Sequence, residues 1–301
     1  MSPDSAAGHR FSPDAAEVHP HILEALAHPL VSSRGPEMDE MVQSLRAPLK
    51  SLFRTSREVF VSAGSADGLM EAAIRCGVEE RVLVIIGGAS GEQFAQIALA
   101  CGKEVVRVMV HPGRSLDPEH LAQFLDGPEV DAVALVHAEI STGALAPLAD
   151  LTPVVRAKKD IHLLVDATGS LAGSPVETDA WGLDFVFAGS EKALALPPGL
   201  ALGNASPRFL DRSRKLKGRG LYLDVARMAD ASSRNEPATT PAIPHWFALR
   251  AQLDRIDANG GIESRWKHHH EMLTMVEEWA ILNPRVRLLA PEGRRAWTVS
   301  C

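Results

Sequence analysis

Apolar residues occur in short blocks that alternate with amphipathic stretches along most of the chain. Continuous apolar runs at residues 81–86, 132–137 and 162–165 predict buried strands, because strands of a parallel sheet are covered on both faces. The alternation of such runs with helical patterns predicts an α/β fold with a mostly parallel central sheet. Further strands are predicted at residues 59–61, 105–110, 185–188, 199–203 and 286–289, and helices at 22–30, 38–53, 69–75, 92–100, 117–125, 246–258 and 263–280.

Local signals suggest how these elements are connected. Residues 228–244 are rich in Ser, Asn, Pro and Thr, a composition typical of a linker. We expect Ser115 or Asp117 to cap the helix that starts at residue 117, since their side-chain oxygens accept hydrogen bonds from free backbone N–H groups. The apolar run at residues 296–301 predicts a strand around Trp297-Thr298-Val299.

The composition narrows the class of protein. The chain has 301 residues, 46% hydrophobic and 23% charged, as expected of a soluble protein with one or two domains. Its formal net charge of −7 argues against a nucleic-acid binder, which needs a basic surface. The sequence shows neither an apolar segment that predicts a membrane span nor, in residues 1–10, a secretory signal. Three cysteines are too few for a disulfide framework or a spaced zinc site, so we expect a cytoplasmic protein.

Four predicted strands end in polar residues, and functional residues of open parallel sheets gather at the carboxyl ends of strands. At the first, Ser65, Ala66 and Asp67 stand between two glycines at the start of a predicted helix. Small residues let the backbone approach a ligand, and free N–H groups at a helix start favour an anion such as phosphate. The same segment also fits a plain strand-to-helix turn.

The second and third strand ends carry hydroxyl and carboxyl groups. Ser141 and Thr142 can offer hydroxyls to a ligand ring, or serve as a cap and turn. Asp166 follows Leu163-Leu164-Val165 directly, where a buried carboxylate needs a partner such as a protonated pyridine nitrogen. A helix cap is the alternative for Asp166.

The fourth strand end carries Lys192, which is flanked by small and apolar residues. A lysine that loses hydration in such surroundings becomes a usable amine nucleophile. An isolated lysine is ordinarily a solvated surface charge. The order along the chain, a small-residue turn, an acidic strand end and then a lysine, favours the functional interpretation.

Taken together, these segments resemble the class V aminotransferases of fold type I. These are pyridoxal-phosphate enzymes that include alanine–glyoxylate and serine–pyruvate aminotransferases. The resemblance covers nearly the whole chain and is most specific from Val165 to Gly199, a segment that contains Asp166 and Pro197-Pro198-Gly199. It also includes Phe11-Ser12-Pro13, Glu17-Val18-His19-Pro20, Arg34-Gly35-Pro36-Glu37, the lysine segment Gly189-Ser190-Glu191-Lys192-Ala193-Leu194, and Thr240-Pro241.

The resemblance implies a domain organisation for the chain. Residues 1–20 would form an N-terminal segment, 21–235 a large cofactor-binding domain, and 236–301 an inter-domain helix and the start of a C-terminal small domain. In the family that small domain continues past the match to Val299 and carries an arginine that binds the substrate carboxylate. We therefore expect an incomplete small domain and a truncated chain with reduced activity. Arg294 and Arg295 precede the expected strand and are not assigned the arginine's role.

The resemblance also implies a catalytic pair and a reaction. Lys192 would form a Schiff base with pyridoxal 5′-phosphate and move the proton between Cα and C4′. Asp166 would pair with the pyridinium nitrogen and keep it protonated. The implied reaction moves an amino group from a small amino acid of the alanine or serine type to a 2-oxo acid of the glyoxylate or pyruvate type.

Further implied cofactor contacts surround this pair. They comprise residues near the ring, residues of the phosphate cup, a polar residue beside the lysine, and a segment that completes the phosphate site of a neighbouring subunit. That last segment implies a homodimer. The residues near the ring are Ser90, Ser141, Thr142 and Thr168, and those of the phosphate cup are Ser65, Ala66 and Asp67. Glu191 is the polar residue beside the lysine, and Thr239 and Thr240 belong to the segment of the neighbouring subunit.

Several of these positions depart from the family pattern. Ser90 stands where an aromatic side chain usually covers the cofactor, and stacking contributes about 0.5–1.5 kcal/mol beyond burial. Phe94, one helical turn later, is a candidate to compensate. Asp67, Glu191 and Asp14 are acidic where neutral residues are common, and a carboxylate repels a nearby phosphate or substrate carboxylate. We expect Asp67 to point away from the phosphate or to cap the helix.

Three alternatives stay open. A truncated or degenerate fold type I protein without catalysis is favoured by the acidic substitutions and by Ser90. A related pyridoxal-phosphate lyase or cysteine desulfurase is less favoured, because Cys76 follows a predicted helix and Cys101 ends one. A nicotinamide dehydrogenase is disfavoured by the absence of a G-x-G-x-x-G motif.

Overall fold

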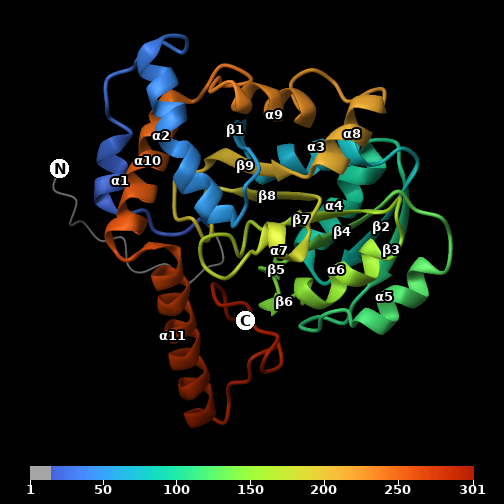
Figure 1. The fold of residues 1–301 in the computed structure, drawn as a ribbon. Coiled ribbons are helices and arrows are strands. Elements are labelled where there is room, and N and C mark those ends of the chain that lie inside the picture. Colours follow the sequence, from blue (N-terminus) through green and yellow to red (C-terminus); the bar gives the residue numbers. More distant parts are fainter. Residues whose placement is uncertain (1–14) are drawn as a thin grey trace.

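A seven-stranded sheet forms the centre of the structure, a computed structural model that describes residues 15–301 (Figure 1). The strand order is β1-β9-β8-β7-β4-β2-β3, in which β9 runs antiparallel to both of its neighbours and the other pairs are parallel. The predicted α/β fold is therefore confirmed. The strands are β1 (Val59–Gly64), β2 (Arg81–Ile86), β3 (Glu104–Met109), β4 (Ala132–Val136), β7 (His162–Asp166), β8 (Phe185–Gly189) and β9 (Gly199–Ala205), and a separate hairpin pairs β5 (Ala138–Glu139) with β6 (Ala144–Leu145).

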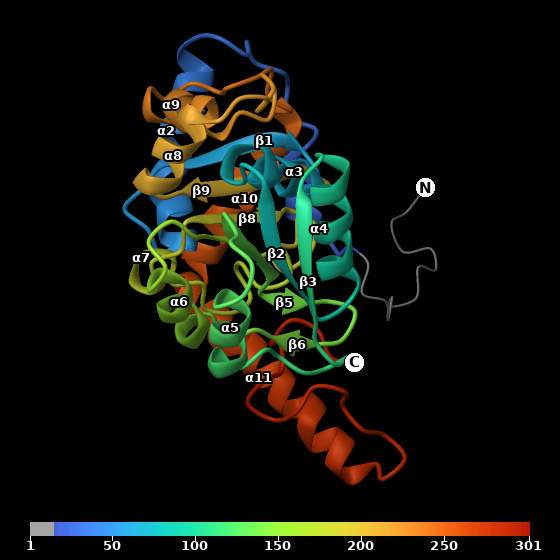
Figure 2. The same ribbon diagram turned by 90° about the vertical axis from the view of Figure 1, so that its right-hand side faces the viewer.

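Helices cover both faces of this sheet, as the two perpendicular views show (Figures 1 and 2). Strand side chains alternate between two apolar cores; in β2, Leu83 and Ile85 belong to one and Val84 and Ile86 to the other. This two-sided burial explains the continuous apolar runs of the sequence. Buried residues of α1 (Pro20–Ala25), α2 (Pro36–Phe53), α5 (Pro118–Leu125), α6 (Leu148–Arg156) and α10 (Ile243–Ala258) belong to the first core, and those of α3 (Ala66–Gly77), α4 (Ala89–Ala100), α8 (Pro207–Lys215) and α9 (Val225–Ser233) to the second.

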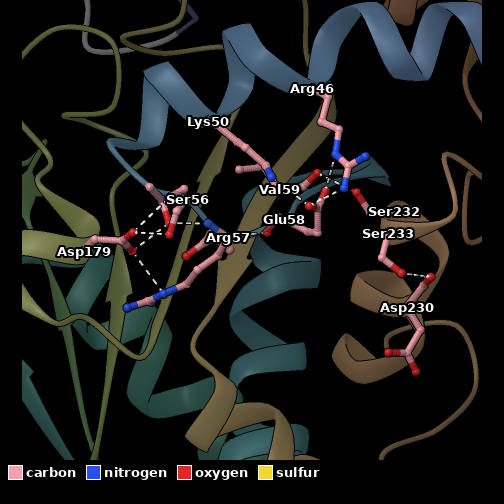
Figure 3. A network of polar contacts seen from close by, with 12 residues as sticks. Arg46, Lys50, Ser56, Arg57, Glu58, Val59, Asp179, Asp230, Ser232 and Ser233 are labelled. Atoms are coloured by element: carbon pink, nitrogen blue, oxygen red, sulfur yellow. Dashed lines mark hydrogen bonds and ion pairs between the residues drawn. The ribbon is translucent and has the colours of Figure 1, made fainter.

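Polar contacts hold α2 against the edge of the sheet (Figure 3). Arg46 and Lys50 lie one turn apart on α2, and their nitrogens are 2.6 and 2.7 Å from the Glu58 carboxylate just before β1. Burial raises the pKa of Glu58, but the hydrogen bonds from Arg46 and Lys50 outweigh it and the pKa is lowered. On the other side of this segment, Asp179 accepts hydrogen bonds from the Ser56 backbone and hydroxyl. These contacts fix the connection that leads into β1 and thus into the first polar strand end.

The linker predicted at residues 228–244 is wrong in its first part. α9 continues to Ser233, because Met228, Ala229 and Ala231 are buried and their apolar contacts stabilise the helix despite its polar composition. Asp224 caps α9 by accepting a hydrogen bond from the Arg227 N–H. The connection to α10 is therefore shorter than expected, and the predicted domain boundary at residue 235 falls within it.

Two predicted C-terminal strands do not form. Residues 286–289 have no neighbouring strand to pair with; instead the Val286 N–H closes a turn with the Asn283 carbonyl at 2.8 Å. Residues 297–299 are also irregular, and the only ladder contact of this segment is an isolated bridge between Arg295 and Ala144. An apolar run forms a strand only where a partner supplies hydrogen bonds, and here the run packs against loops of the sheet edge.

Three smaller expectations are also corrected or limited by the structure. α1 ends at Ala25, earlier than predicted, and α5 starts after Asp117 without a side-chain capping bond. The Ser115 hydroxyl donates to the Leu145 carbonyl at 2.7 Å instead of capping α5. The motif at residues 11–13 and Asp14 lie outside the described residues.

The last long helix, α11 (Gly261–Leu282), projects from the body of the molecule, and the chain then returns to the region of β5 and β6 (Figures 1 and 2). Within residues 15–301, none of the helices combines the length and apolar character of a membrane span. The first turns of α11 face the sheet: Ile262 and Trp266 belong to the same apolar core as α10.

Candidate active site

The polar strand ends come together at one edge of the sheet. β4, β7 and β8 are parallel neighbours, with Val136 opposite Asp166 and Asp166 opposite Phe187. β1 reaches the same edge, since Gly64 pairs with Gly199 where β9 begins. The four polar segments after β1, β4, β7 and β8 therefore lie at one edge of the sheet, and their functional roles stay a prediction.

Asp166 is the buried carboxyl group of this edge. It is 4% exposed, and one of its oxygens, Oδ1, accepts hydrogen bonds from the Thr168 N–H at 2.8 Å and the Thr168 hydroxyl at 2.5 Å. Burial raises the pKa of Asp166 to about 6; the Thr168 hydrogen bonds act against this, and Glu139 and Glu191 add to it. A cationic N–H group beside this carboxyl would restore its ionised form.

Thr168 connects the aspartate to the lysine segment. Its hydroxyl oxygen accepts a hydrogen bond from the Gly189 N–H at 3.0 Å while the hydroxyl donates to Asp166. Gly189 is the last residue of β8, three positions before Lys192. Thr168 thus fixes the distance between the end of β7 and the start of the lysine turn.

Lys192 is half-buried in a turn that buried polar groups hold together. Ser190 is fully buried, and its hydroxyl donates to the Pro197 carbonyl at 2.9 Å. Within the turn, the Ala195 N–H donates to the Lys192 carbonyl at 2.9 Å. The side chain of Lys192 therefore leaves from a closed turn directly after β8.

Glu191 turns back toward the sheet. A Cβ on Gly189 would come within 2.6 Å of the Glu191 Oε2, so the carboxylate lies close against the end of β8. The Glu191 backbone carbonyl accepts a hydrogen bond from the Ala16 N–H at 2.8 Å, which brings the N-terminal segment to the site. The carboxylate of Glu191 thus lies near the buried Asp166 and contributes to raising its pKa.

Glu139 is a functional candidate that the sequence reasoning missed. It is 4% exposed and its carboxylate accepts hydrogen bonds from the N–H groups of Ser90 at 3.3 Å and Gly91 at 3.2 Å, at the start of α4. It also accepts the Ser141 hydroxyl at 2.6 Å. A related signal is present at Glu139, which follows the strand predicted at residues 132–137 after one intervening residue, Ala138.

The close packing around Glu139 depends on a glycine. A Cβ on Gly88 would lie 2.3 Å from the Ser141 oxygen and 2.6 Å from Glu139 side-chain carbons. Ala89, the next residue, donates its N–H to the Ser141 oxygen at 2.9 Å. The start of α4 and the β5–β6 hairpin are therefore joined through one buried carboxylate and one hydroxyl.

The two hydroxyls predicted to lie near a ligand ring differ in their hydrogen bonding. Ser141 already donates to Glu139 and accepts from Ala89. Thr142 is 5% exposed, and its hydroxyl has no hydrogen-bond partner among the described residues. A buried polar group without a partner is costly, so Thr142 is a position that a ligand atom would satisfy.

The compensation expected from Phe94 is wrong. Phe94 is fully buried and packs edge-to-face against Phe187 at 6.0 Å, in the core between α4 and the sheet. Ala95 and Ala98 of α4 belong to the same core as Phe94, so this face of the helix packs against the sheet. Ser90, at the start of α4, is partly exposed, and its N–H is bound by Glu139.

Residues 65–67 form an open turn into α3. Ser65 precedes the first helical residue but makes no side-chain capping bond, and Asp67 is exposed in the first turn. Gly64 has a φ of 134°, a backbone conformation that favours glycine. The start of α3 therefore offers backbone N–H groups to an anion.

Thr239 and Thr240 lie apart from the lysine segment. They line an open cavity of about 860 Å³ together with Arg34, Tyr222 and Arg227, and no residue of the Lys192 turn contributes to it. The Tyr222 hydroxyl donates to the Ala63 carbonyl at 3.3 Å, which places one wall of this cavity beside the end of β1. The role of both threonines in a neighbouring subunit stays a prediction.

These residues fit the cofactor that the resemblance implies. Burial raises the pKa of Asp166, and a pyridinium nitrogen beside this carboxyl would favour its ionised form. Thr142 has an unsatisfied hydroxyl, and the start of α3 is open to a phosphate. Lys192 supplies the amine at the same sheet edge. A carboxyl group, a hydroxyl, an amine and the N–H groups at the start of α3 thus match a phosphorylated pyridine aldehyde.

The chain is similar in sequence and structure to known aminotransferases. The chain matches the model of the aminotransferase class-V family over residues 16–301. It is 32% identical to an uncharacterised aminotransferase of Methanocaldococcus jannaschii, over 96% of this chain and 75% of that protein. A solved aspartate aminotransferase of subgroup IV from Thermus thermophilus has a TM-score of 0.83 and 34% identity, covering 96% of this chain and 80% of the other. An alanine–glyoxylate aminotransferase from Nostoc sp. has a TM-score of 0.89 and 26% identity, covering 96% and 77%. The chain belongs to the class-V aminotransferase family of pyridoxal-phosphate-dependent enzymes.

Proposed function

We propose that this protein moves an amino group from a small amino acid of the alanine or serine type to a 2-oxo acid of the glyoxylate or pyruvate type. The observation that carries the proposal is the pairing, through Thr168, of a buried carboxyl at the end of β7 with the lysine turn after β8. An acid that holds a ring cation and an amine on the adjacent strand are the two protein groups that this chemistry requires.

In this proposal Lys192 and Asp166 act on different atoms. Bound pyridoxal phosphate supplies the electron sink that stabilises negative charge at the substrate Cα. The Lys192 amine would hold the aldehyde end of the cofactor and would move a proton at the substrate Cα. Asp166 would hold the proton on the ring nitrogen. Burial raises the pKa of this carboxyl, and the two hydrogen bonds from Thr168 act against that rise.

The remaining predicted contacts position the cofactor. The N–H groups around Ser65, Ala66 and Asp67 bind the phosphate, with the Asp67 carboxylate turned to solvent. Thr142 supplies a hydroxyl on the ring side, and Ser141 acts through its bond to Glu139. These roles rest on the open start of α3 and on the unsatisfied Thr142 hydroxyl.

Two other positions set how firmly the cofactor is held. Ser90 leaves the ring without an aromatic cover, and Glu191 places a carboxylate near Asp166 where the family has a neutral residue. We expect weaker binding than an aromatic at position 90 would give, by about 0.5–1.5 kcal/mol. Thr239 and Thr240 reach the phosphate of a second subunit in a homodimer.

The choice of substrate class rests on the relatives. The Nostoc protein is named for alanine and glyoxylate, whereas the Thermus protein is named for aspartate. We favour the small amino acid because the described site edge already carries the carboxylates of Glu139, Asp166 and Glu191, which disfavour a further anionic side chain.

A cysteine desulfurase receives no support from the thiols. Such an enzyme needs a thiolate nucleophile. Burial raises the pKa of Cys76, Cys101 and Cys301, and Glu139 adds to the effect at Cys301. Cys76 lies inside α3 rather than after it. The protonated thiol is therefore favoured at all three positions.

A spectroscopic experiment tests the proposal. Purified protein with pyridoxal phosphate is expected to show a visible absorbance band that borohydride removes and that Lys192→Ala abolishes. Adding alanine or serine is expected to shift the band, and glyoxylate or pyruvate to restore it. Lys267→Ala, an exposed lysine of α11, is the matched control and should keep the band. A band that persists in Lys192→Ala contradicts the assignment, and a band without an amino-acid response favours a non-catalytic protein.

A further inference from the structure

Arg265 of α11 lies directly behind the two catalytic turns. Its Nε donates to the Ala172 carbonyl at 3.0 Å and its Nη2 to the Ala193 carbonyl at 2.8 Å. Ala193 follows Lys192, and Ala172 belongs to the turn that follows Asp166 and Thr168. One guanidinium therefore joins the segments that carry the catalytic lysine and the catalytic aspartate.

The two turns need support from outside. Ala172 has a φ of 76° and Ala195 a φ of 55°, a left-handed conformation that is strained for residues other than glycine. Such conformations persist where the surrounding structure fixes them. The hydrogen bonds from Arg265 reach the carbonyl of Ala172 itself and the carbonyl two residues before Ala195.

The charge of Arg265 is bound by carbonyl groups rather than by a carboxylate. Among the described residues Arg265 makes no ion pair. Two charged or titratable groups lie near it: Arg255, which lowers the pKa of Arg265, and His269, whose pKa is lowered by Arg265. Burial and the nearby Arg255 lower the pKa of Arg265. Burying a guanidinium at this position is unfavourable, and its two hydrogen bonds to carbonyl oxygens offset that cost.

A second side chain holds the same turn. The Gln252 Nε2 of α10 donates to the Leu194 carbonyl at 2.6 Å, and Gln252 is 2% exposed. The carbonyls of Ala193 and Leu194 are thus each bound by a side chain from a different helix. The two helices, α10 and α11, thus support the turn that carries Lys192.

We propose that Arg265 is a positioning residue that fixes the Lys192 turn relative to the Asp166 turn, with Gln252 as a second support. This inference rests on the proposed function of Lys192. The Lys192 nitrogen forms a bond to the aldehyde carbon, and the aldehyde oxygen leaves as water. The rate of that step depends on the position of the amine, and a misplacement near 1 Å costs about a hundredfold.

The test compares covalent attachment with non-covalent binding in Arg265→Met. Covalent attachment is measured as the amount of cofactor that borohydride traps on the peptide containing Lys192. Non-covalent binding is measured as the affinity for pyridoxine 5′-phosphate, which lacks the aldehyde. We expect attachment to slow by about tenfold to a hundredfold and the pyridoxine 5′-phosphate affinity to change by less than about threefold. Hydrogen exchange should rise in residues 170–175 and 190–197.

Two variants complete the design. Lys267→Met removes an exposed positive charge from the same helix and should leave all three readouts unchanged. Arg265→Lys keeps the charge but not the guanidinium fork, and an intermediate attachment rate is expected; it also serves if Arg265→Met does not fold. Unchanged attachment, or equal losses of attachment and pyridoxine 5′-phosphate binding, overturns the inference. Trapping on a lysine other than Lys192 contradicts the proposed function instead, and hydrogen exchange then decides whether Arg265 holds the two turns.

Discussion

The two sides of the candidate site are built in opposite ways. The inner side, formed by Glu139, Asp166, Thr168 and Ser190, is buried, and its polar groups are bound to one another or to nearby backbone. The outer side, formed by residues 64–67 at the start of α3, is largely exposed. Buried polar groups need partners within the fold, whereas exposed N–H groups are satisfied by water until a ligand displaces it. In our proposal, one chain supplies the lysine and ring side, and the ligand and a second subunit complete the phosphate side.

The largest effect is expected from breaking the inner side at its carboxyl group. Asp166→Ala removes the partner of the ring cation, and losing one member of a buried charge pair costs about 3–5 kcal/mol. We expect a loss of two to four orders of magnitude, as about 1.4 kcal/mol corresponds to tenfold, in the rate of the half-reaction with alanine followed by absorbance. Asp67→Ala on the outer side is the control and should lose less than tenfold. Similar losses in both variants contradict the division into two sides.

The pH dependence of stability tests the burial of Asp166 directly. Its pKa is raised from 3.8 to about 6 in the folded protein, so the folded state binds more protons than the unfolded state between these values. This group alone lowers the free energy of unfolding as the pH rises from about 4 to about 6, by up to about 3 kcal/mol. Asp166→Asn should remove that loss in the cofactor-free protein.

Buried histidines change the free energy of unfolding with pH in the opposite direction, so the measurement needs a control for them. Burial lowers the pKa of His137 to about 3 and those of His162 and His269 to about 4. Their contribution to stability is present above about pH 6.5 and is lost as the pH falls. The informative quantity is therefore the difference between Asp166→Asn and the unaltered protein, measured by urea unfolding at pH 4 and pH 7. Parallel pH curves for the two proteins refute the raised pKa.

Two adjacent glycines, Gly87 and Gly88, allow a test of how closely the buried groups pack at the start of α4. In Gly88→Ala the new Cβ would overlap the Ser141 oxygen and Glu139, so we expect destabilisation of about 1–3 kcal/mol. Gly87→Ala meets only the Arg114 carbonyl oxygen at 3.9 Å and should be tolerated. Thermal unfolding of both variants measures the difference. Equal unfolding temperatures mean that the Glu139 cluster is not closely packed.

The smallest expected effect strengthens the cofactor site. Ser90→Phe restores an aromatic side chain at the position where the family usually carries one, and stacking on the ring is worth about 0.5–1.5 kcal/mol. We expect the affinity for pyridoxine 5′-phosphate to rise by about two- to tenfold, measured by fluorescence titration. Ser141→Ala, which breaks the bond to Glu139, should instead weaken binding. A weaker affinity in Ser90→Phe means that residue 90 does not face the ring.

Much of the framework could be predicted from the sequence because its signals are local. Runs such as residues 81–86 are apolar throughout, and buried parallel strands require that pattern. The placement of Asp166 and Lys192 directly after such strands predicts where their side chains emerge, since carboxyl ends of parallel strands share one edge. The errors fall where local signals conflict with packing, as in α9, whose polar composition hides a buried face.

The sequence by itself thus determined the α/β sheet, its polar edge and the likeness to the class-V family. Only the tertiary structure decided which groups satisfy one another. The bond between Gly91 and Glu139 joins residues 48 positions apart, and that between Arg265 and Ala172 joins residues 93 positions apart. It also decided that the apolar run at 297–299 packs against loops and that Phe94 lies in the core. Hydrogen bonds and packing between distant segments depend on the folded arrangement of helices and strands, and no periodicity along the chain records them.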